Sequence, residues 1–182
     1  MNDNAFWPGT KVLRGDSRPP GAQDAGLARR DDRRAITIKL LNQALMIARM
    51  GALRCERQYF AALRGQSPAL AAAALDHANE AQTHADDISR RIAELGGKPD
   101  SSLDGAAQRA VSEQRNGTSL ATMIGHHLAT ERVTIKIYRE IVAAFSSFDR
   151  PSQELIERII IYEEECASDL ARLLEELSPR DC

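Results

Sequence analysis

Apolar residues recur at steps of three and four along four long segments of the chain. These segments run from about 35 to 64, from about 68 to 95, from about 118 to 145 and from about 151 to 177. Such spacing lines one face of an α-helix, and alternating steps of three and four are typical of the seam between packed helices. The pattern therefore predicts an all-α protein built as a four-helix bundle.

Turn-forming residues mark where these helices begin and end. Gly65 ends the first segment, and the Gly96–Gly97 pair ends the second. Ser67 and Pro68 supply an N-cap and a first-turn proline for the second helix. The first connection then takes about three residues and the last about five. Connections this short predict that the first two helices are antiparallel, and likewise the last two.

The connection between the second and third helices is much longer, about 22 residues from 96 to 117. A helix of about 28 residues is roughly 42 Å long, whereas about 22 extended residues can span roughly 70 Å. The connection can therefore run the full length of the bundle. We expect an up-down-down-up order with one long crossover between the second and third helices, which is the ferritin-like arrangement.

Residues 1–34 carry proline, glycine and mixed charge without apolar periodicity. They predict a disordered or extended N-terminal tail ahead of a bundle domain at 35–178. Phe6 and Trp7 could dock on a partner, although an adhesive spot on a disordered arm is the simpler interpretation. With seven Lys and Arg against five Asp, the positive surplus of this tail is too small for a DNA-binding arm.

The composition narrows the classes of function. The chain has 24 Lys and Arg against 26 Asp and Glu, which argues against a dedicated nucleic-acid binder. It has no apolar run near the roughly 18 residues of a membrane span, and no secretory signal is visible. Its three cysteines show no framework spacing, so we expect a cytoplasmic protein with no membrane partner.

Three polar residues interrupt the apolar seams at one predicted depth, His84, Glu131 and Glu163. A buried carboxylate is costly unless it is paired or bound to a cation. A metal ion would satisfy this layer, as would an Arg or Lys from a neighbouring helix, or a proton shared between the carboxyls. His77 and His127 also lie on the seams, but a single histidine on an apolar stripe is usually a satisfied core residue.

Several motifs in order resemble the bacterioferritin branch of the ferritin-like superfamily over residues 36–177. They are "LLNQAL", "HANEAQTHADDISRRIAELGGKPD", "LATERVTIKIYREI" and "YEEECASDLARLL". The resemblance implies a ferritin-like bundle. It also implies a family that oxidises ferrous iron at a di-iron centre and stores the ferric product in a hollow oligomeric shell.

The resemblance places six iron ligands on this sequence, at Ala48, Ala81, His84, Glu131, Glu163 and Cys166. Two carboxylate positions are therefore alanines, Ala48 and Ala81, and a histidine position is a cysteine. Two ferrous ions need about four carboxylates. The implied di-iron set is degenerate, with impaired iron binding and weak or no ferroxidase activity. The haem-binding methionine of the branch falls at Gln82, so no haem is expected.

Other interpretations remain open on the residues alone. One zinc or copper ion could be held by His84, Glu131, Glu163 and Cys166. The simpler interpretation is that Cys55 and Cys166 are small buried hydrophobes; a disulfide between them is conceivable, but no spacing supports it.

The assembly and the role of the chain also remain open. The C-terminal "SPRDC" is too short for the fifth helix of shell-forming bacterioferritins. We expect a homo-oligomer, a dimer or higher and up to a hollow shell, or co-assembly with an active relative. The chain would then either store iron with a weakened centre or serve as a non-catalytic scaffold subunit. A metal-free bundle whose polar layer only fixes the fold is the third possibility.

Overall fold

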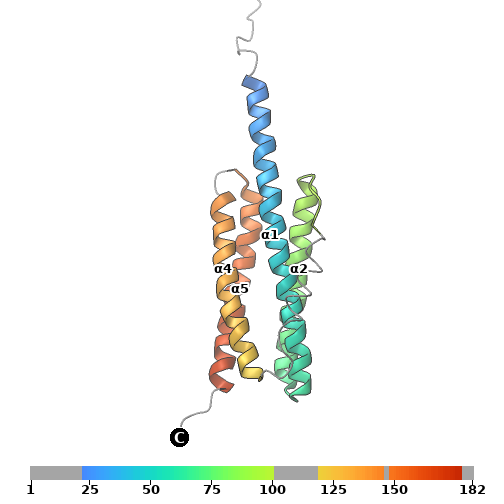
Figure 1. Cartoon of the computed structure of the whole chain (residues 1–182), viewed down its shortest axis with the longest axis vertical. Helices are drawn as coiled ribbons and strands as arrows, with labels where there is room; N and C mark the ends of the chain where they lie inside the picture. Colours follow the sequence, from blue (N-terminus) through green and yellow to red (C-terminus); the bar gives the residue numbers. More distant parts are fainter. Residues whose placement is uncertain (1–21, 101–118, 146–147, 178–182) are drawn as a thin grey trace, which may run out of the picture.

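The computed structural model describes residues 22–100, 119–145 and 148–177. The described part of the chain forms four long helices, α1 (Ala22–Arg64), α2 (Pro68–Glu94), α4 (Leu120–Phe145) and α5 (Arg150–Leu177). They pack into one bundle, in which α1 lies chiefly against α2 and α4 chiefly against α5 (Figure 1). This confirms the predicted all-α four-helix bundle. None of these helices has an apolar stretch that could cross a bilayer.

The direction of the helices agrees with the predicted topology. α1 runs down and α2 returns up, whereas α4 runs up and α5 returns down (Figure 1). α2 and α4 are therefore parallel, and the crossover between them must return along the bundle. Its first residues already do so beside α1, where the Asp100 amide donates to Asn42 Oδ1 at 2.8 Å and Arg49 donates to the Asp100 carbonyl at 3.2 Å. Residues 101–118 lie outside the described residues.

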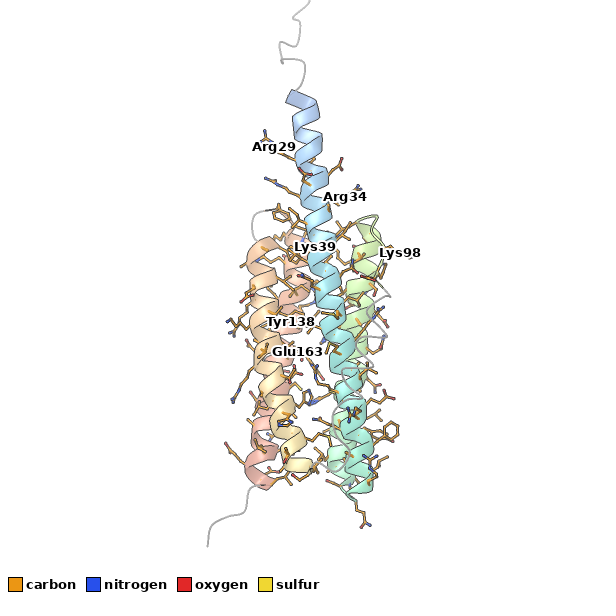
Figure 2. All side chains as sticks on the ribbon, viewed as in Figure 1. Arg29, Arg34, Lys39, Lys98, Tyr138 and Glu163 are labelled. Atoms are coloured by element: carbon orange, nitrogen blue, oxygen red, sulfur yellow. The ribbon has the colours of Figure 1, made fainter. Side chains whose placement is uncertain are left out.

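α1 begins at Ala22, well before the start near residue 35 that the apolar pattern predicts. Residues 29–36 are exposed, and this part of α1 projects beyond the bundle, with Arg29 and Arg34 pointing outward (Figure 2). An apolar stripe is absent there because these residues are exposed, although Arg33 lies over the Phe148 ring, 5.7 Å from its centre. Alanine, leucine and arginine favour helix, and extending an existing helix needs no new nucleus. The predicted tail over residues 1–21, including Phe6 and Trp7, lies outside the described residues.

The turn between α1 and α2 differs in detail from the prediction. Gln66, not Gly65, takes the left-handed conformation, with φ 56°. Ser67 precedes α2 as predicted and Pro68 is its first residue, but the Ser67 side chain makes no capping hydrogen bond. After α2, Gly96 has φ 72° and the Gly97 amide donates to the Ile92 carbonyl at 2.9 Å. This is the glycine-ended helix that the sequence predicts.

The interior has an apolar core on each side of a polar layer. The larger core includes Leu41, Leu45, Ile88, Ile92, Tyr138, Phe145, Ile156 and Ile159. The smaller core consists of Ile124, Leu128, Cys166 and Leu170. Burying each large aliphatic side chain contributes about 1.5–3 kcal/mol, so these two cores hold the helices in the register that positions the layer between them.

A second polar cluster ties the end of α2 to the turn before α5. Arg91 donates to Asp149 Oδ1 and to Ser152 Oγ, each at 3.0 Å. Asp149 also accepts from the Ser152 amide at 3.1 Å and from the Ser152 hydroxyl at 2.9 Å. Asp149 is therefore the N-cap of α5, and its charge is satisfied by a helix from the other half of the bundle.

Candidate functional site

Glu131 and Glu163 face each other in the middle of the bundle, from α4 and α5. The exposed fractions of these residues are 2% and 9%, and their carboxyl groups are close enough for each to shift the pKa of the other. The helices bring them together because each residue lies on the apolar seam of its own helix at equal depth. Two of the three residues predicted to share a central layer therefore meet as expected.

Arg54 of α1 supplies the positive charge of this layer. Its Nη2 lies 3.3 Å from Glu131 Oε1, and the Arg54 side chain is 11% exposed. Gly51 lies three residues earlier on α1, and a Cβ there would make only ordinary contacts. A Cβ added to Gly51 would lie 3.9 Å from Arg54 Nη2 and 3.8 Å from the Cβ of Ala81. Ala81 is one of the two positions at which the resemblance implies a carboxylate, and it is buried.

His127 is the second partner of Glu131. It lies one turn earlier on α4, and its Nε2 is 2.8 Å from Glu131 Oε1, with both side chains almost fully buried. Since a carboxylate oxygen accepts, Nε2 carries the proton of this bond. The other ring nitrogen, Nδ1, is buried and has no hydrogen-bond partner among the described residues.

The two carboxyl groups have opposite pKa shifts. Burial raises the pKa of Glu163 to about 8, aided by the charge of Glu131 and the hydrogen bond to it. Burial also acts to raise the pKa of Glu131, but His127 and Arg54 outweigh it and hold that pKa below its usual value. Near neutral pH Glu131 is therefore ionised and Glu163 keeps its proton, which it donates to Glu131. The buried carboxyl groups are therefore stabilised by an arginine and by a shared proton. These are two of the three possibilities that the sequence leaves open.

Both seam cysteines are paired with histidines. Cys166 Sγ lies 3.3 Å from His77 Nδ1, and Cys55 Sγ lies 4.0 Å from His127 Nε2. The cysteines are free, so the disulfide between them is not formed. Burial raises the pKa of the Cys55 thiol to about 12 and raises that of Cys166 as well. Both are neutral thiols in the metal-free protein.

His84 lies apart from the two glutamates. Its ring packs edge-on against Tyr162, with the ring centres 5.1 Å apart. Its Nδ1 is buried without a hydrogen-bond partner in the described part of the chain, and burial lowers its pKa. Of the four predicted metal ligands, the structure joins Glu131 to Glu163, pairs Cys166 with His77 and directs His84 to Tyr162. Over the described residues, no three His, Cys, Asp or Glu side chains are grouped so as to hold a metal ion.

The donor set does not fit a di-iron group. Ala48 and Ala81 are buried and offer no donor atom. The one ionised carboxylate, Glu131, is already bonded to a guanidinium and an imidazole. A buried arginine beside the remaining donors opposes a pair of divalent cations.

Two residues of this layer were not predicted from the sequence. His127 could have been found, because it stands four residues before Glu131 and side chains at that spacing meet on a helix. Arg54 carried no such signal, since it lies at the edge of the α1 stripe and its partner Glu131 is on another helix.

Residues 65–179 match the ferritin-like domain family. The chain therefore belongs to the ferritin-like family. Its fold is similar to that of the bacterioferritin of Desulfovibrio desulfuricans, a protein with a diiron site, at a TM-score of 0.73 and 23% identity over 81% of this chain and 83% of that one. It is also similar to a variant of Dps1 from Mycobacterium smegmatis, at a TM-score of 0.69 and 14% identity over 79% of this chain and 98% of that one.

A curated relative is a nutrient stress-induced DNA-binding protein from a Nostoc species, which is 34% identical over 99 residues. The match covers 53% of this chain and 54% of that protein. The chain thus spans about half the length of this relative.

Proposed function

We propose that this chain is a ferritin-like subunit that contributes to iron storage as a structural component and does not oxidise Fe(II) inside its own bundle. The observation that carries the proposal is the ion pair between Arg54 and Glu131, with Nη2 and Oε1 3.3 Å apart. The positively charged side chain of Arg54 lies where a di-iron centre of the family would need carboxylates.

Electrostatic energies support the proposal that this interior does not hold divalent iron. At an effective dielectric constant of 20, two unit charges 4 Å apart interact by about 4 kcal/mol. A divalent ion beside the Arg54 guanidinium would be opposed by roughly twice that energy. The layer holds one ionised carboxylate against one guanidinium, so no negative charge remains to offset the repulsion.

A structural role requires assembly with other subunits. Phe60 and Leu63 lie one turn apart on α1 and are 49% and 48% exposed. Val133 and Ile161, on the outer faces of α4 and α5, are 57% and 59% exposed. Neighbouring bundles would cover such apolar side chains. Assembly is either with copies of this chain or with an active ferritin-like relative.

The decisive experiment compares Fe(II) oxidation by the purified chain with the protein-free rate in air. We expect the two rates to be equal within error. A variant with Ala48→Glu, Ala81→Glu, Cys166→His and Arg54→Leu restores the six ligand positions and removes the guanidinium, so it should oxidise Fe(II) faster than the native chain. Oxidation by the native chain well above the protein-free rate would refute the proposal. Light scattering coupled to size exclusion then tests assembly, and a monomer that also fails to join a ferritin shell would contradict the structural role.

DNA binding is the second candidate function. It is favoured by the similarity to the Nostoc DNA-binding protein and by four exposed arginines on the projecting end of α1, Arg29, Arg30, Arg33 and Arg34. Asp31 and Asp32 between them offset half of this charge. A mobility-shift titration at low and moderate salt tests it: retardation that is lost on Arg29→Glu and Arg30→Glu supports this candidate, and none at low salt excludes it.

A further inference from the structure

Three large apolar side chains are exposed at the end of the α1–α2 hairpin. Phe60 and Leu63 of α1 are 49% and 48% exposed, and Leu75 of α2 is 41% exposed. We call these three side chains the hairpin patch. The Phe60 ring packs edge-on against Tyr59, with the ring centres 5.1 Å apart. Single exposed apolar residues are normal on a protein surface, whereas a group of them indicates a contact site.

Leu75 and Phe60 lie at nearly the same height along the bundle. Gly51 packs beside Ala81, since a Cβ added to Gly51 would lie 3.8 Å from the Cβ of Ala81. α1 and α2 are antiparallel, so an equal number of residues toward the turn on each helix brings Arg57 level with Leu75. Phe60 follows Arg57 by only about 4.5 Å along the helix axis. The exposed side chains of the two helices are therefore close enough to form one patch.

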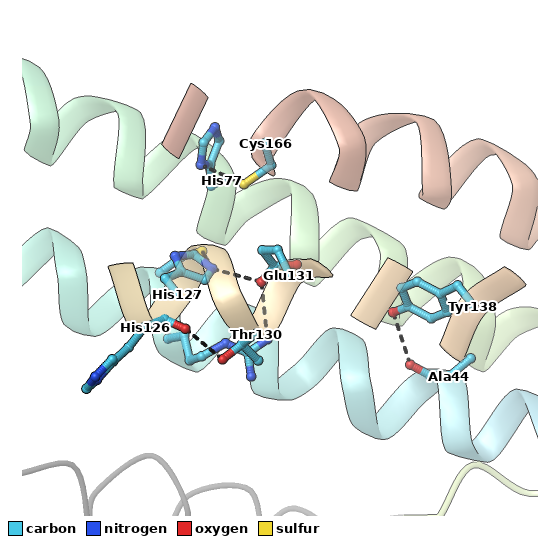
Figure 3. A network of polar contacts seen from close by, with 10 residues as sticks. Ala44, His77, His126, His127, Thr130, Glu131, Tyr138 and Cys166 are labelled. Carbon is cyan, nitrogen blue, oxygen red and sulfur yellow. Dashed lines mark hydrogen bonds and ion pairs between the residues drawn. The ribbon is translucent and has the colours of Figure 1, made fainter. Parts of the chain in front are cut away.

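The hairpin patch faces away from the interior of the bundle. Figure 3 shows the interior side of α1, where Ala44 is fully buried and its carbonyl accepts from the Tyr138 hydroxyl at 3.4 Å. At 100° per residue, Phe60 is turned about 160° around α1 from Ala44. The part of the chain that the structure describes therefore leaves the hairpin patch uncovered.

Phe6 and Trp7 are adjacent aromatic residues in a mainly polar stretch ahead of α1, and Trp7 is the only tryptophan of the chain. We call these two residues the aromatic pair. Each aromatic side chain can bury about 150–250 Å², and tryptophan is enriched among the residues that dominate binding energy at interfaces. The aromatic pair therefore suits the hairpin patch in chemistry and in size.

The aromatic pair cannot reach the hairpin patch of its own chain. α1 begins at Ala22, at the opposite end of the molecule from the α1–α2 turn (Figure 1). Phe60 lies about 57 Å from Ala22 along α1, at 1.5 Å per residue. The stretch from Trp7 to Ala22 spans at most roughly 54 Å even when fully extended, and it would also have to reverse direction at Ala22. The hairpin patch within its reach is therefore that of another copy.

We propose that the aromatic pair of one copy docks on the hairpin patch of a second copy. An antiparallel neighbour brings the projecting N-terminal end of its α1 beside the α1–α2 turn. In a two-fold pair, each copy then supplies one aromatic pair and receives one. Docking removes apolar surface of both partners from water, which is the driving force of the contact. The inference deepens the proposed function by naming one contact of the assembly that it requires, and it rests on that proposal in this respect.

The fluorescence of Trp7 tests the contact, because no other residue of the chain gives tryptophan emission. In the full native chain we expect emission at a shorter wavelength than that of free tryptophan amide. The emission should return to the free value at concentrations where light scattering shows a monomer. Phe60→Glu and Leu75→Glu should each move it to the free value at the concentration at which the native chain is assembled.

A peptide of residues 1–21 separates docking from assembly. The receptor is the full chain with Phe6→Ser and Trp7→Ser, which has no tryptophan of its own and leaves the hairpin patch open to the peptide. We expect saturable binding that shifts the peptide emission to shorter wavelength. Adding Phe60→Glu to the receptor should weaken the binding at least about tenfold. Val133→Glu is the matched control, since Val133 is an apolar residue of α4 that is 57% exposed, and it should leave the binding unchanged.

Several results would overturn the proposal. They are free-tryptophan emission from the native chain, no saturable binding of the peptide, and equal weakening by the hairpin-patch and control substitutions. A shifted emission that persists in the monomer would place the aromatic pair on its own chain and would overturn it as well. Circular dichroism melts confirm that each variant is folded. Light scattering and Fe(II) oxidation of the same preparations report separately on the proposed function, which stands if the chain assembles without burying Trp7.

Discussion

The guanidinium of Arg54, from α1, lies 3.3 Å from Oε1 of Glu131, from α4, inside a bundle of the ferritin-like family. The contact joins the two halves of the bundle at the depth where the resemblance implies a metal centre. It ties the stability of this chain to a charge pair whose members are both nearly excluded from water. The effect of this pair on the free energy of unfolding can be measured by substitution.

Arg54→Met should destabilise the protein by about 3–5 kcal/mol, because it leaves the Glu131 carboxylate buried without its cation. Urea unfolding at neutral pH, followed by circular dichroism, measures the change in the free energy of unfolding. The double variant Arg54→Met with Glu131→Gln removes both charges and should recover at least half of the loss. A loss below about 1 kcal/mol in the single variant would show that the pair behaves as a surface ion pair.

The contribution of Glu163 to stability should fall as the pH rises from about 4.3 toward 8. Burial raises the pKa of Glu163 to about 8 in the folded protein, whereas the unfolded value is about 4.3. Between these values the folded state binds more protons than the unfolded state, so the free energy of unfolding decreases with pH, by at most about 1.4 kcal/mol per unit. The contribution is fully present below the lower pKa and is lost through the upper one.

Urea unfolding of metal-free protein at several pH values measures this slope, and Glu163→Gln should flatten it. An equal slope in the native chain and the Gln variant would assign the pH dependence to other groups.

Asp149→Ala should lower the free energy of unfolding by about 2–4 kcal/mol, since it removes the α5 N-cap and the buried ion pair that joins Arg91 of α2 to the start of α5. Thermal unfolding by calorimetry measures the effect. The matched control is Glu154→Ala, which removes only the exposed ion pair to Arg150, with side chains 81% and 50% exposed. The control should change stability by less than about 0.5 kcal/mol. Equal effects of the two substitutions would contradict the role assigned to the Asp149 cluster.

Gly97→Ala should destabilise by about 1–3 kcal/mol. An added Cβ would come within 2.9 Å of the Ile38 side chain on α1, which forces the start of the crossover away from the bundle. Gly125→Ala is the control: its Cβ would lie 3.8 Å from Leu174, an ordinary contact, and alanine in mid-helix should stabilise by about 0.5–1 kcal/mol. Chemical denaturation of both variants measures whether each substitution lowers or raises the free energy of unfolding. A Gly97→Ala variant as stable as the native chain would show that Ile38 moves aside freely.

The apolar pattern was sufficient to predict the helices and their order, because the buried positions of a packed helix recur at a regular spacing. Nearly every α4 seam position, from Ile124 to Phe145, is buried as the pattern predicts. The pattern did not predict helix where the helical residues are exposed. It placed the start of α1 near 35, because residues 29–36 are helical but exposed, so no apolar stripe marks them.

The sequence by itself determined a four-helix bundle with one long crossover and two carboxyls meeting in its middle, because helical periodicity and loop length follow from local chemistry. Only the tertiary structure decided what those carboxyls bind. Arg54 of α1 reaches Glu131 of α4, and His127 contacts the same carboxylate from one turn earlier on α4. Which side chain fills an interior gap depends on packing between elements distant in sequence, and no periodicity along one helix encodes it.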